Sequence, residues 1–350
     1  MRRVMLALFA LLLVGASSYP VVRPGIALRF PADHGAHPAF RTEWWYVTGR
    51  IKGDDGRDLG FQITFFRTTP KVDTANPSRF APRQILFAHA ALSDPKISRL
   101  LHGERAARGG FGLAQARVGD ADVALRDWRI RRLRDGRFKT TVATRDFALS
   151  LVLRPTQPPL PQGEGGYSRK GPRPDQASYY YSLPHLAVTG RITRGGKAQA
   201  VRGQAWLDRE WSSDYLGGQA VGWDWTGLNL DDGGALMAFR IRGKDGKPIW
   251  AGGSLRRADG RITRFAPGEV RFDSFRTWRS PRTGALYPVG QNLTIKLPEG
   301  VRSWRLDPLF DDQELDARRG GQPVYWEGAV KTRGGSGYLE LTGYASPLRM

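Results

Sequence analysis

Cysteine is absent from this sequence of 350 residues, and histidine occurs only 5 times. Without cysteine the protein has no disulfide, thiolate nucleophile, cysteine-ligated zinc or iron–sulfur cluster. The sequence also has no G-x-S-x-G nucleophile elbow, no H-E-x-x-H zinc motif and no glycine-rich dinucleotide or phosphate fingerprint. His34 and His37 are close together, but histidine pairs in loops are usually solvated. We therefore expect neither a metal nor a cofactor, and α/β-hydrolase chemistry has no support.

Acidic residues are scarce relative to basic ones. The chain has 54 Lys and Arg against 33 Asp and Glu, which gives a formal net charge of +21. Such a balance favours anionic partners, namely nucleic acid, a membrane surface or an acidic ligand. An apolar fraction of 40% and an aromatic fraction of 11% exclude a disordered chain. The composition is that of a basic globular protein.

The first residues have the pattern of an export signal. Arg2 and Arg3 precede an apolar run from Val4 to Val14, and small residues follow, with cleavage expected after Ala16. Spanning a bilayer takes about 20 apolar residues, more than this run provides, although an uncleaved anchor is the alternative. We assign residues 1–18 to a cleavable signal peptide and expect a periplasmic or secreted protein. Export argues against nucleic acid as a partner.

The remaining chain has the pattern of β-strands. Short segments rich in Val, Ile, Phe, Tyr, Trp and Thr are separated by Gly, Asp and Pro turns. Asp-Gly steps at 55–56, 135–136, 232–233 and 245–246 each lie between two such segments and favour tight hairpins. No long stretch has convincing helical periodicity. The sequence predicts an all-β protein.

Two hairpins resemble each other about half a chain apart. In residues 43–67, Glu-Trp-Trp-Tyr-Val-Thr-Gly precedes an Asp-Asp-Gly turn and an apolar strand. In residues 222–240, Gly-Trp-Asp-Trp-Thr-Gly precedes a second Asp-Asp-Gly turn and another apolar strand. The repeat predicts two β domains that each begin with the same kind of hairpin, although hairpins also resemble one another by chance.

Residues 155–178 are rich in proline, glycine and glutamine. Proline lacks the backbone donor of a strand ladder, so this stretch is not expected to form a central strand. We predict a long exposed loop. It is either a lid over a ligand site or a tolerated surface insertion, and the insertion is the favoured interpretation.

One strand-like segment combines tryptophan with carboxylates. In extended conformation Trp206, Asp208 and Glu210 share one face. Arg209 and Trp211 share the opposite face. Desolvation among tryptophans raises the pKa of a carboxylate, which suits general-acid chemistry. The alternative is a structural pair between Arg209 and a carboxylate beside core aromatics.

A second segment, Gly222–Trp225, has the same character. Trp223 and Trp225 share one strand face and Asp224 points to the other. Tryptophan faces stabilise positive charge, as an acid-generated cation requires. If the tryptophans face a cavity, Asp224 does not.

Eight motifs run in order from about residue 30 to residue 345. They are Glu43–Gly49, Ala88–Asp94, Tyr179–Ser182, Trp206–Trp211, Gly222–Trp225, Asp312–Glu314, Tyr325–Gly328 and Gly337–Tyr344. As a set they resemble the AttH-type lipocalin-like family, which includes the carotenoid 1,2-hydratases. The resemblance implies two successive lipocalin-like antiparallel β-barrels, an N-terminal domain over residues 25–212 and a C-terminal domain over residues 213–350.

The resemblance also implies a function. We expect an exported protein that binds an apolar ligand, a polyene or lipid, and hydrates an isolated double bond by acid catalysis. The alternative is a non-catalytic carrier or chaperone of a hydrophobic molecule that works with an ABC-transporter permease. An anionic membrane surface is a further expected partner of either.

The candidate site follows from these segments. Arg209 stands where the hydratases are expected to carry a histidine, and a guanidinium is neither acid nor base near neutral pH. The candidate catalytic residues are therefore Asp208, Glu210 and Asp224 as proton donors and Trp211 as a cation stabiliser. The candidate ligand-binding residues are Trp45, Tyr181, Trp206, Trp223 and Trp225. Because both segments lie near the start of the second hairpin copy, we place the site at the junction of the two domains.

Residues 126–134 are rich in arginine. In extended conformation they place cations on both faces, as an exposed edge strand would. Edge protection against aggregation is the favoured interpretation, and docking on anionic lipid is the alternative.

Overall fold

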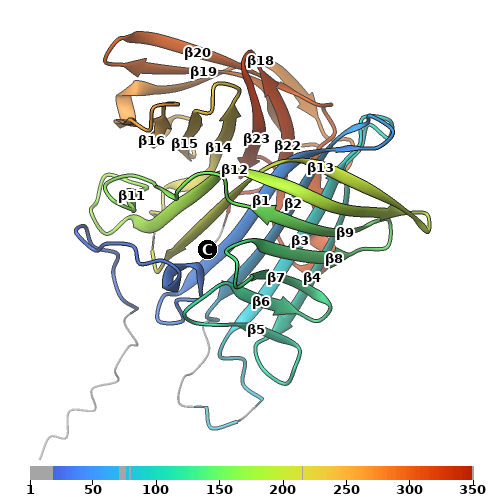
Figure 1. Ribbon diagram of the computed structural model, residues 1–350. Helices are drawn as coiled ribbons and strands as arrows, with labels where there is room; N and C mark the ends of the chain where they lie inside the picture. Colours follow the sequence, from blue (N-terminus) through green and yellow to red (C-terminus); the bar gives the residue numbers. More distant parts are fainter. Residues whose placement is uncertain (1–18, 71–75, 79, 215, 349–350) are drawn as a thin grey trace, which may run out of the picture.

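The computed structural model describes residues 19–70, 76–78, 80–214 and 216–348 (Figure 1). The predicted signal peptide, residues 1–18, lies outside the described residues. The described chain contains 23 strands and three short 3-10 helices, η1 (Ala32–His34), η2 (Pro267–Glu269) and η3 (Arg318–Gly320). Nowhere in those ranges is there a helix long and apolar enough to cross a membrane. The prediction of an all-β protein is confirmed.

The first sheet has thirteen strands in the order β4-β3-β2-β1-β13-β12-β9-β8-β7-β6-β5, with β10 and β11 paired to β12. The edge strand β4 packs against β6, so this sheet is nearly closed into a barrel. Its strands are β1 (Thr42–Gly53), β2 (Asp58–Thr68), β3 (Ile85–Ser93), β4 (Leu101–Arg108), β5 (Ala114–Ala116), β6 (Asp122–Leu125), β7 (Trp128–Arg132), β8 (Phe138–Ala143), β9 (Ala148–Arg154), β10 (Leu160–Pro161), β11 (Tyr167–Arg169), β12 (Ala177–Arg194) and β13 (Lys197–Ser212).

The second sheet has ten strands in the order β17-β16-β15-β14-β23-β22-β20-β19-β18, with β21 paired to β22. It also curls, because β15 and β16 pack against β18. Its strands are β14 (Ala220–Leu230), β15 (Ala235–Gly243), β16 (Pro248–Arg256), β17 (Ile262–Phe265), β18 (Val270–Arg279), β19 (Leu286–Leu297), β20 (Gly300–Pro308), β21 (Glu314–Asp316), β22 (Val324–Thr332) and β23 (Gly335–Thr342).

The two sheets share one topological plan. In each, the first strand forms a hairpin with the second and also pairs, antiparallel, with the last strand of the same sheet. The two hairpins of the sequence repeat are β1–β2 and β14–β15, so the repeat falls on equivalent strands. The first sheet ends at Ser212 and the second begins at Ala220. The domain boundary at residues 212 and 213 stays a prediction.

Four apolar clusters hold the described structure together, of which the smallest, Ala91, Leu100, Leu315, Ala317 and Tyr325, lies where the two sheets meet. One fills the first sheet and a second fills the second sheet. The third joins them: Tyr46, Tyr180 and Trp206 of the first sheet pack against side chains of the second such as Trp225 and Phe239. In Figure 1 the strands of the second sheet lie against β1, β12 and β13. Strands β1 and β13 are therefore buried on both faces, by their own barrel on one and by the other sheet on the opposite one.

The prediction of a long exposed loop at residues 155–178 is wrong. Leu160 and Gln162 are fully buried, and the amide of Gln162 bonds both Ser182 of the first sheet and Ser254 of the second. Arg256 of the second sheet also donates to the carbonyl of Pro158. Proline excluded a central strand, as expected, but the segment is packed between the two sheets.

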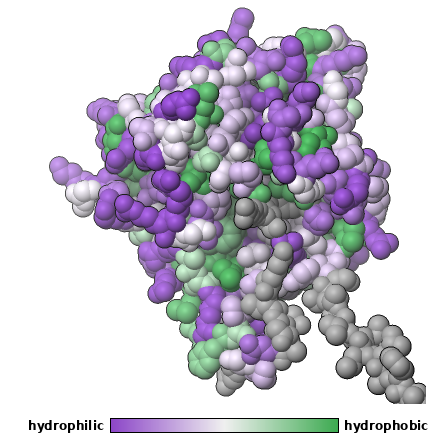
Figure 2. All heavy atoms as spheres, turned by 180° about the vertical axis from the view of Figure 1, so that it is seen from behind, coloured by the Kyte–Doolittle hydropathy of each residue, from purple (hydrophilic) through white to green (hydrophobic). Residues whose placement is uncertain are grey.

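The prediction of an exposed arginine-rich edge strand is also wrong. Strand β7 lies between β6 and β8, with Trp128 and Ile130 buried in the core. Arg129 and Arg132 pair with aspartates on the outside. Figure 2 shows hydrophilic side chains spread over most of one face of the molecule, with small hydrophobic groups between them.

Candidate functional site

A pocket lies between the two sheets. Its volume is about 90 Å³ and its walls come from both halves of the chain. Its aromatic and aliphatic side chains are Trp44, Tyr46, Phe66, Tyr180, Trp223, Trp225, Phe239, Ile241 and Tyr325. Its polar side chains are Gln62, Thr64, Lys170, Asp208, Glu210, Glu327 and Glu340. The pocket therefore gathers four carboxyl groups among aromatic rings.

Strand alternation decides which side chains reach the pocket. On β13, Asp208 and Glu210 face the second sheet, while Arg209 and Trp211 face the interior of the first barrel. The antiparallel register then sets Tyr46 of β1 opposite Asp208. On β14, Trp223 and Trp225 line the pocket and Asp224 points away from it. The alternation predicted from the sequence holds on both strands.

Asp208 is fixed by three hydrogen-bond donors. Ser182 Oγ and Trp206 Nε1 each donate to Oδ1 at 2.6 Å, and the Tyr180 hydroxyl donates to Oδ2 at 2.6 Å. Burial raises the pKa of Asp208 to about 7, although these three donors act to lower it. Trp206 is therefore a neighbour that positions Asp208.

Glu210 is paired with Lys170, which comes from the proline-rich segment. Lys170 Nζ lies 3.1 Å from Glu210 Oε1, and the hydroxyl of Ser178 also bonds that oxygen. The ammonium lies 4.6 Å from the ring centre of Tyr180 and 4.3 Å from that of Phe239. Among the described residues that line the pocket, Lys170 is the only basic one.

The other two carboxyl groups, Glu327 and Glu340, come from β22 and β23. They are directly opposite each other in the strand register. The Tyr46 hydroxyl donates to Glu327 Oε1 at 2.5 Å, and Trp223 Nε1 donates to Glu340 Oε2 at 3.1 Å. Burial, and then repulsion from Glu340, raise the pKa of Glu327 well above its usual value. Burial also raises the pKa of Glu340 to about 7.

A larger groove adjoins the pocket. It has a volume of about 640 Å³ and shares Phe66, Trp223, Tyr325 and Glu340 with the pocket. His89 contributes to its wall, and its Nδ1 lies 2.8 Å from the Tyr325 hydroxyl. Burial lowers the pKa of His89 to about 3, so its imidazole is neutral at pH 7. These shared residues, most of them aromatic, form the common wall of the pocket and the groove.

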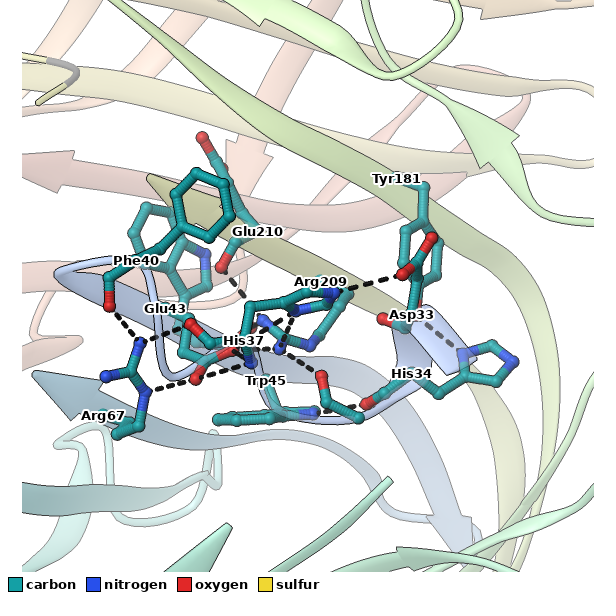
Figure 3. A network of polar contacts seen from close by, with 12 residues as sticks. Asp33, His34, His37, Phe40, Glu43, Trp45, Arg67, Tyr181, Arg209 and Glu210 are labelled. Carbon is teal, nitrogen blue, oxygen red and sulfur yellow. Dashed lines mark hydrogen bonds and ion pairs between the residues drawn. The ribbon is translucent and has the colours of Figure 1, made fainter. Parts of the chain in front are cut away.

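A buried ion-pair network lies on the other side of β13 (Figure 3). Arg209 and Arg67 both pair with Glu43, and all three side chains are almost fully buried. Burial acts to raise the pKa of Glu43, but Arg209, His37 and Arg67 outweigh it and lower the pKa to about 2. The Arg209 guanidinium lies 3.9 Å from the ring centre of Trp45. Arg209 thus serves the packing of the first barrel.

Three of the predicted site residues, Trp211, Trp45 and Tyr181, lie next to this network. Trp211 stacks on His37 with ring centres 3.8 Å apart. Trp45 donates its indole N–H to the carbonyl of His34, whose Nδ1 is 2.7 Å from the Tyr181 hydroxyl. All three aromatic residues belong to the core of the first barrel.

Asp224 is held in a similar way in the second sheet. Its carboxylate pairs with Arg240 at 2.6 Å and with Arg242 at 3.0 Å, and it accepts a bond from the Tyr344 hydroxyl at 2.9 Å. The side chain is fully buried on the face of β14 opposite the pocket. Asp224 therefore stabilises the second sheet through buried ion pairs.

The structure brings together four of the predicted site residues, Asp208, Glu210, Trp223 and Trp225, with Trp206 directly behind Asp208. It places Asp224, Trp211, Trp45 and Tyr181 away from the pocket, because they lie on the opposite strand faces. The sequence-based interpretation missed Glu327, Glu340 and Lys170. The two glutamates alternate with apolar residues on their strands, a pattern that marks a buried carboxyl but does not say what it faces.

The fold and the pocket define a lipocalin-like protein of two antiparallel sheets with an acidic, aromatic site between them. The chain belongs to the AttH-like family, whose family model matches residues 21–344. The resemblance in the sequence is therefore confirmed. No curated protein matches the sequence.

Solved structures share the fold over nearly the whole chain. The crystal structure of an AttH protein from Nitrosomonas europaea is 53% identical, with a TM-score of 0.86, and the match covers 93% of this chain and 99% of that one. Kievitone hydratase from Nectria haematococca is 15% identical with a TM-score of 0.68, covering 95% of each chain. CghA with Sch210972 is 14% identical with a TM-score of 0.55, covering 93% of this chain and 96% of that one. At these identities the last two show the fold alone.

Proposed function

We propose that the protein binds an apolar ligand in the pocket between its sheets and adds water to an isolated carbon–carbon double bond of that ligand. The observation that carries the proposal is the set of four carboxyl groups within an aromatic pocket. A buried carboxyl with a raised pKa is a proton donor at neutral pH. Here burial raises the pKa of Asp208 and of Glu340 to about 7, and it raises the pKa of Glu327 well above its usual value.

The pocket suits each stage of acid-catalysed hydration. A neutral carboxyl protonates one alkene carbon, and the positive charge then develops on the other. The faces of Trp223 and Trp225 and the ionised carboxylates stabilise that charge. Water adds to the cation, and a carboxylate takes its surplus proton. The hydratase activity in the name of the Nectria haematococca protein supports this reaction class as one that the fold hosts.

Export and partners remain part of the proposal. The charged and apolar pattern of residues 1–18 supports a cleaved signal and a periplasmic or secreted location. The net charge of +21 supports contact with an anionic membrane surface, from which an apolar ligand would be drawn. In the alternative function, the protein is a non-catalytic carrier and delivers its ligand to an ABC-transporter permease.

The reaction is tested by incubating the protein with a polyene, lycopene, and with a monounsaturated lipid, oleic acid, in ¹⁸O-labelled water. We expect one of them to gain a labelled hydroxyl group, detected by mass spectrometry. The variant D245N, in an exposed turn, should behave as the wild-type protein does. A ligand that co-purifies and is recovered unchanged would favour the carrier, and a protein that binds neither compound would contradict both functions.

A stable cation tests the electrostatics of the pocket without turnover. Octyltrimethylammonium should bind about tenfold to thirtyfold more tightly at pH 8 than its neutral analogue with carbon in place of nitrogen, from a cation–π gain of about 1.5–2 kcal/mol. Its affinity should rise between pH 6 and pH 8, because Asp208 and Glu340 ionise with pKa values of about 7. Titration calorimetry measures both effects. Equal affinities for the two compounds would contradict a site built for positive charge.

A further inference from the structure

The pair formed by Glu327 and Glu340 differs from the other carboxyl groups of the pocket. The two residues are direct neighbours across β22 and β23, where side chains of opposed residues have Cβ atoms about 5 Å apart. Glu327 is 1% exposed, and Tyr46 occupies only its Oε1. Its Oε2 is buried and has no hydrogen-bond partner within the described part of the chain. One carboxyl oxygen beside the pocket is thus free to carry a proton.

The remaining carboxyl groups are already engaged. Asp208 accepts three hydrogen bonds from the protein, two on Oδ1 and one on Oδ2. Glu210 is held by the ammonium of Lys170 and by a serine hydroxyl. Both therefore have oxygens that already accept hydrogen bonds from the protein. Glu340 accepts a hydrogen bond from Trp223 and lies at the boundary between the pocket and the groove.

We propose that Glu327 is the proton donor of the hydration and that Glu340 is the base that accepts the proton of the attacking water. This assignment rests on the proposed function. Repulsion between two carboxylates on directly opposed residues favours the state in which one is neutral while its neighbour is ionised. The burial of Glu327 and the hydrogen bond that Glu340 accepts set which of the two holds the proton.

The step balances without any further reagent. The proton on Glu327 Oε2 moves to one alkene carbon, where the π electrons form the new C–H bond and leave a cation on the other carbon. The oxygen of a water molecule forms the C–O bond, and Glu340 takes the proton that this water releases. Transfer of that proton from Glu340 to Glu327 restores the pair. The net change is the addition of one water molecule.

The same pair predicts a bell-shaped pH profile. Glu340 must be ionised, so kcat/KM should rise as the pH increases through about 7 and fall at higher pH, where Glu327 loses its proton. Other charged and titratable groups face the pair, and they contribute to these macroscopic values. They are Tyr46 of β1, Lys170, Tyr180 of β12, Asp208 and Glu210 of β13, Tyr325 of β22 and Tyr338 of β23.

Infrared difference spectra test the protonation directly. At pH 7.5 the wild-type protein should show neutral-carboxyl absorption that includes a band lost in E327Q and kept in E299Q, a control in an exposed ion pair. Glutamine keeps an oxygen for the Tyr46 hydroxyl, so the fold should tolerate this change. In E327D, which retains the carboxyl, the band should return. A band unaffected by E327Q would overturn the assignment.

Turnover of whichever probe, lycopene or oleic acid, is hydrated supplies the second readout. We expect E327Q to lower kcat by about 100-fold or more with little change in KM, and E327D to recover part of it. E340Q should remove the rise of kcat/KM near pH 7. Wild-type turnover that E327Q leaves within about twofold would overturn the role of Glu327 and spare the proposed function. A wild-type protein that hydrates neither probe would overturn the proposed function, and the catalytic assignment with it, even if the infrared band shows Glu327 to be neutral.

Discussion

Replacement of Glu43 by glutamine should lower the free energy of unfolding by about 3–5 kcal/mol, the usual cost of removing one partner from a buried ion pair. Glu43 is the only acidic partner of both Arg67 and Arg209 among the ion pairs of the described chain. Without its charge, two buried guanidinium groups repel each other with nothing to balance them. Urea unfolding at pH 7 measures the loss.

The same carboxylate predicts how stability depends on pH. The pKa of Glu43 is about 2 in the folded protein, against the ordinary value of 4.5 that applies to the unfolded chain, so the folded state favours the ionised form. The corresponding stabilisation, about 3 kcal/mol, is complete above pH 4.5 and is lost as the pH falls towards 2. E43Q should lack this part of the acid dependence. D55N is the matched control, because Asp55 also has a pKa of about 2 but its side chain lies at the surface. If E43Q and D55N gave the same urea midpoints, the network would not contribute as its geometry indicates.

Replacement of Asp224 by asparagine should destabilise the protein by a similar amount, about 3–5 kcal/mol, because Arg240 and Arg242 lose their shared buried carboxylate. Binding of octyltrimethylammonium should be unchanged at temperatures where the variant is folded. Thermal unfolding and calorimetry together separate the two effects. D273N, in an exposed pair with Arg271, is the control and should change stability by less than about 1 kcal/mol. A D224N variant of normal stability that fails to bind the cation would instead place Asp224 in the site.

The all-β class and the plan of two similar sheets could be predicted from the sequence because both rest on short-range patterns. Strand alternation and Asp-Gly turns are local, and the repeat compares two hairpins directly. Alternation also gave the correct partition of Asp208 and Glu210 from Arg209, and of the two tryptophans from Asp224. These predictions need no knowledge of what lies opposite each strand.

The composition of the site depends on long-range packing and was only half predicted. Strand β13 is buried on both faces, so its sequence does not indicate which face meets a cavity. Trp211 on one face and Trp206 on the other carry the same apolar signal. Pairing of β14 with β23 and of β23 with β22 sets Glu327 and Glu340 beside the tryptophans of β14, and packing of the second sheet on the first brings them to Asp208. Lys170 was missed because proline and glycine in its segment indicated exposure, whereas contacts with Glu210 of the first sheet and Phe239 of the second bury it.

Because the pocket is divided between two sheets, the chain could be expressed as two fragments whose association restores the pocket. The first fragment would carry Lys170, Asp208 and Glu210, and the second would carry Glu327 and Glu340. If the chain is cut between Ser212 and Ala220, the second fragment keeps Glu327 and Glu340 but lacks the pocket wall that β1, β2, β12 and β13 supply, so neither fragment encloses the pocket. Any signal that depends on the pocket, whether from cation binding or from product formation, would then measure complementation of the fragments.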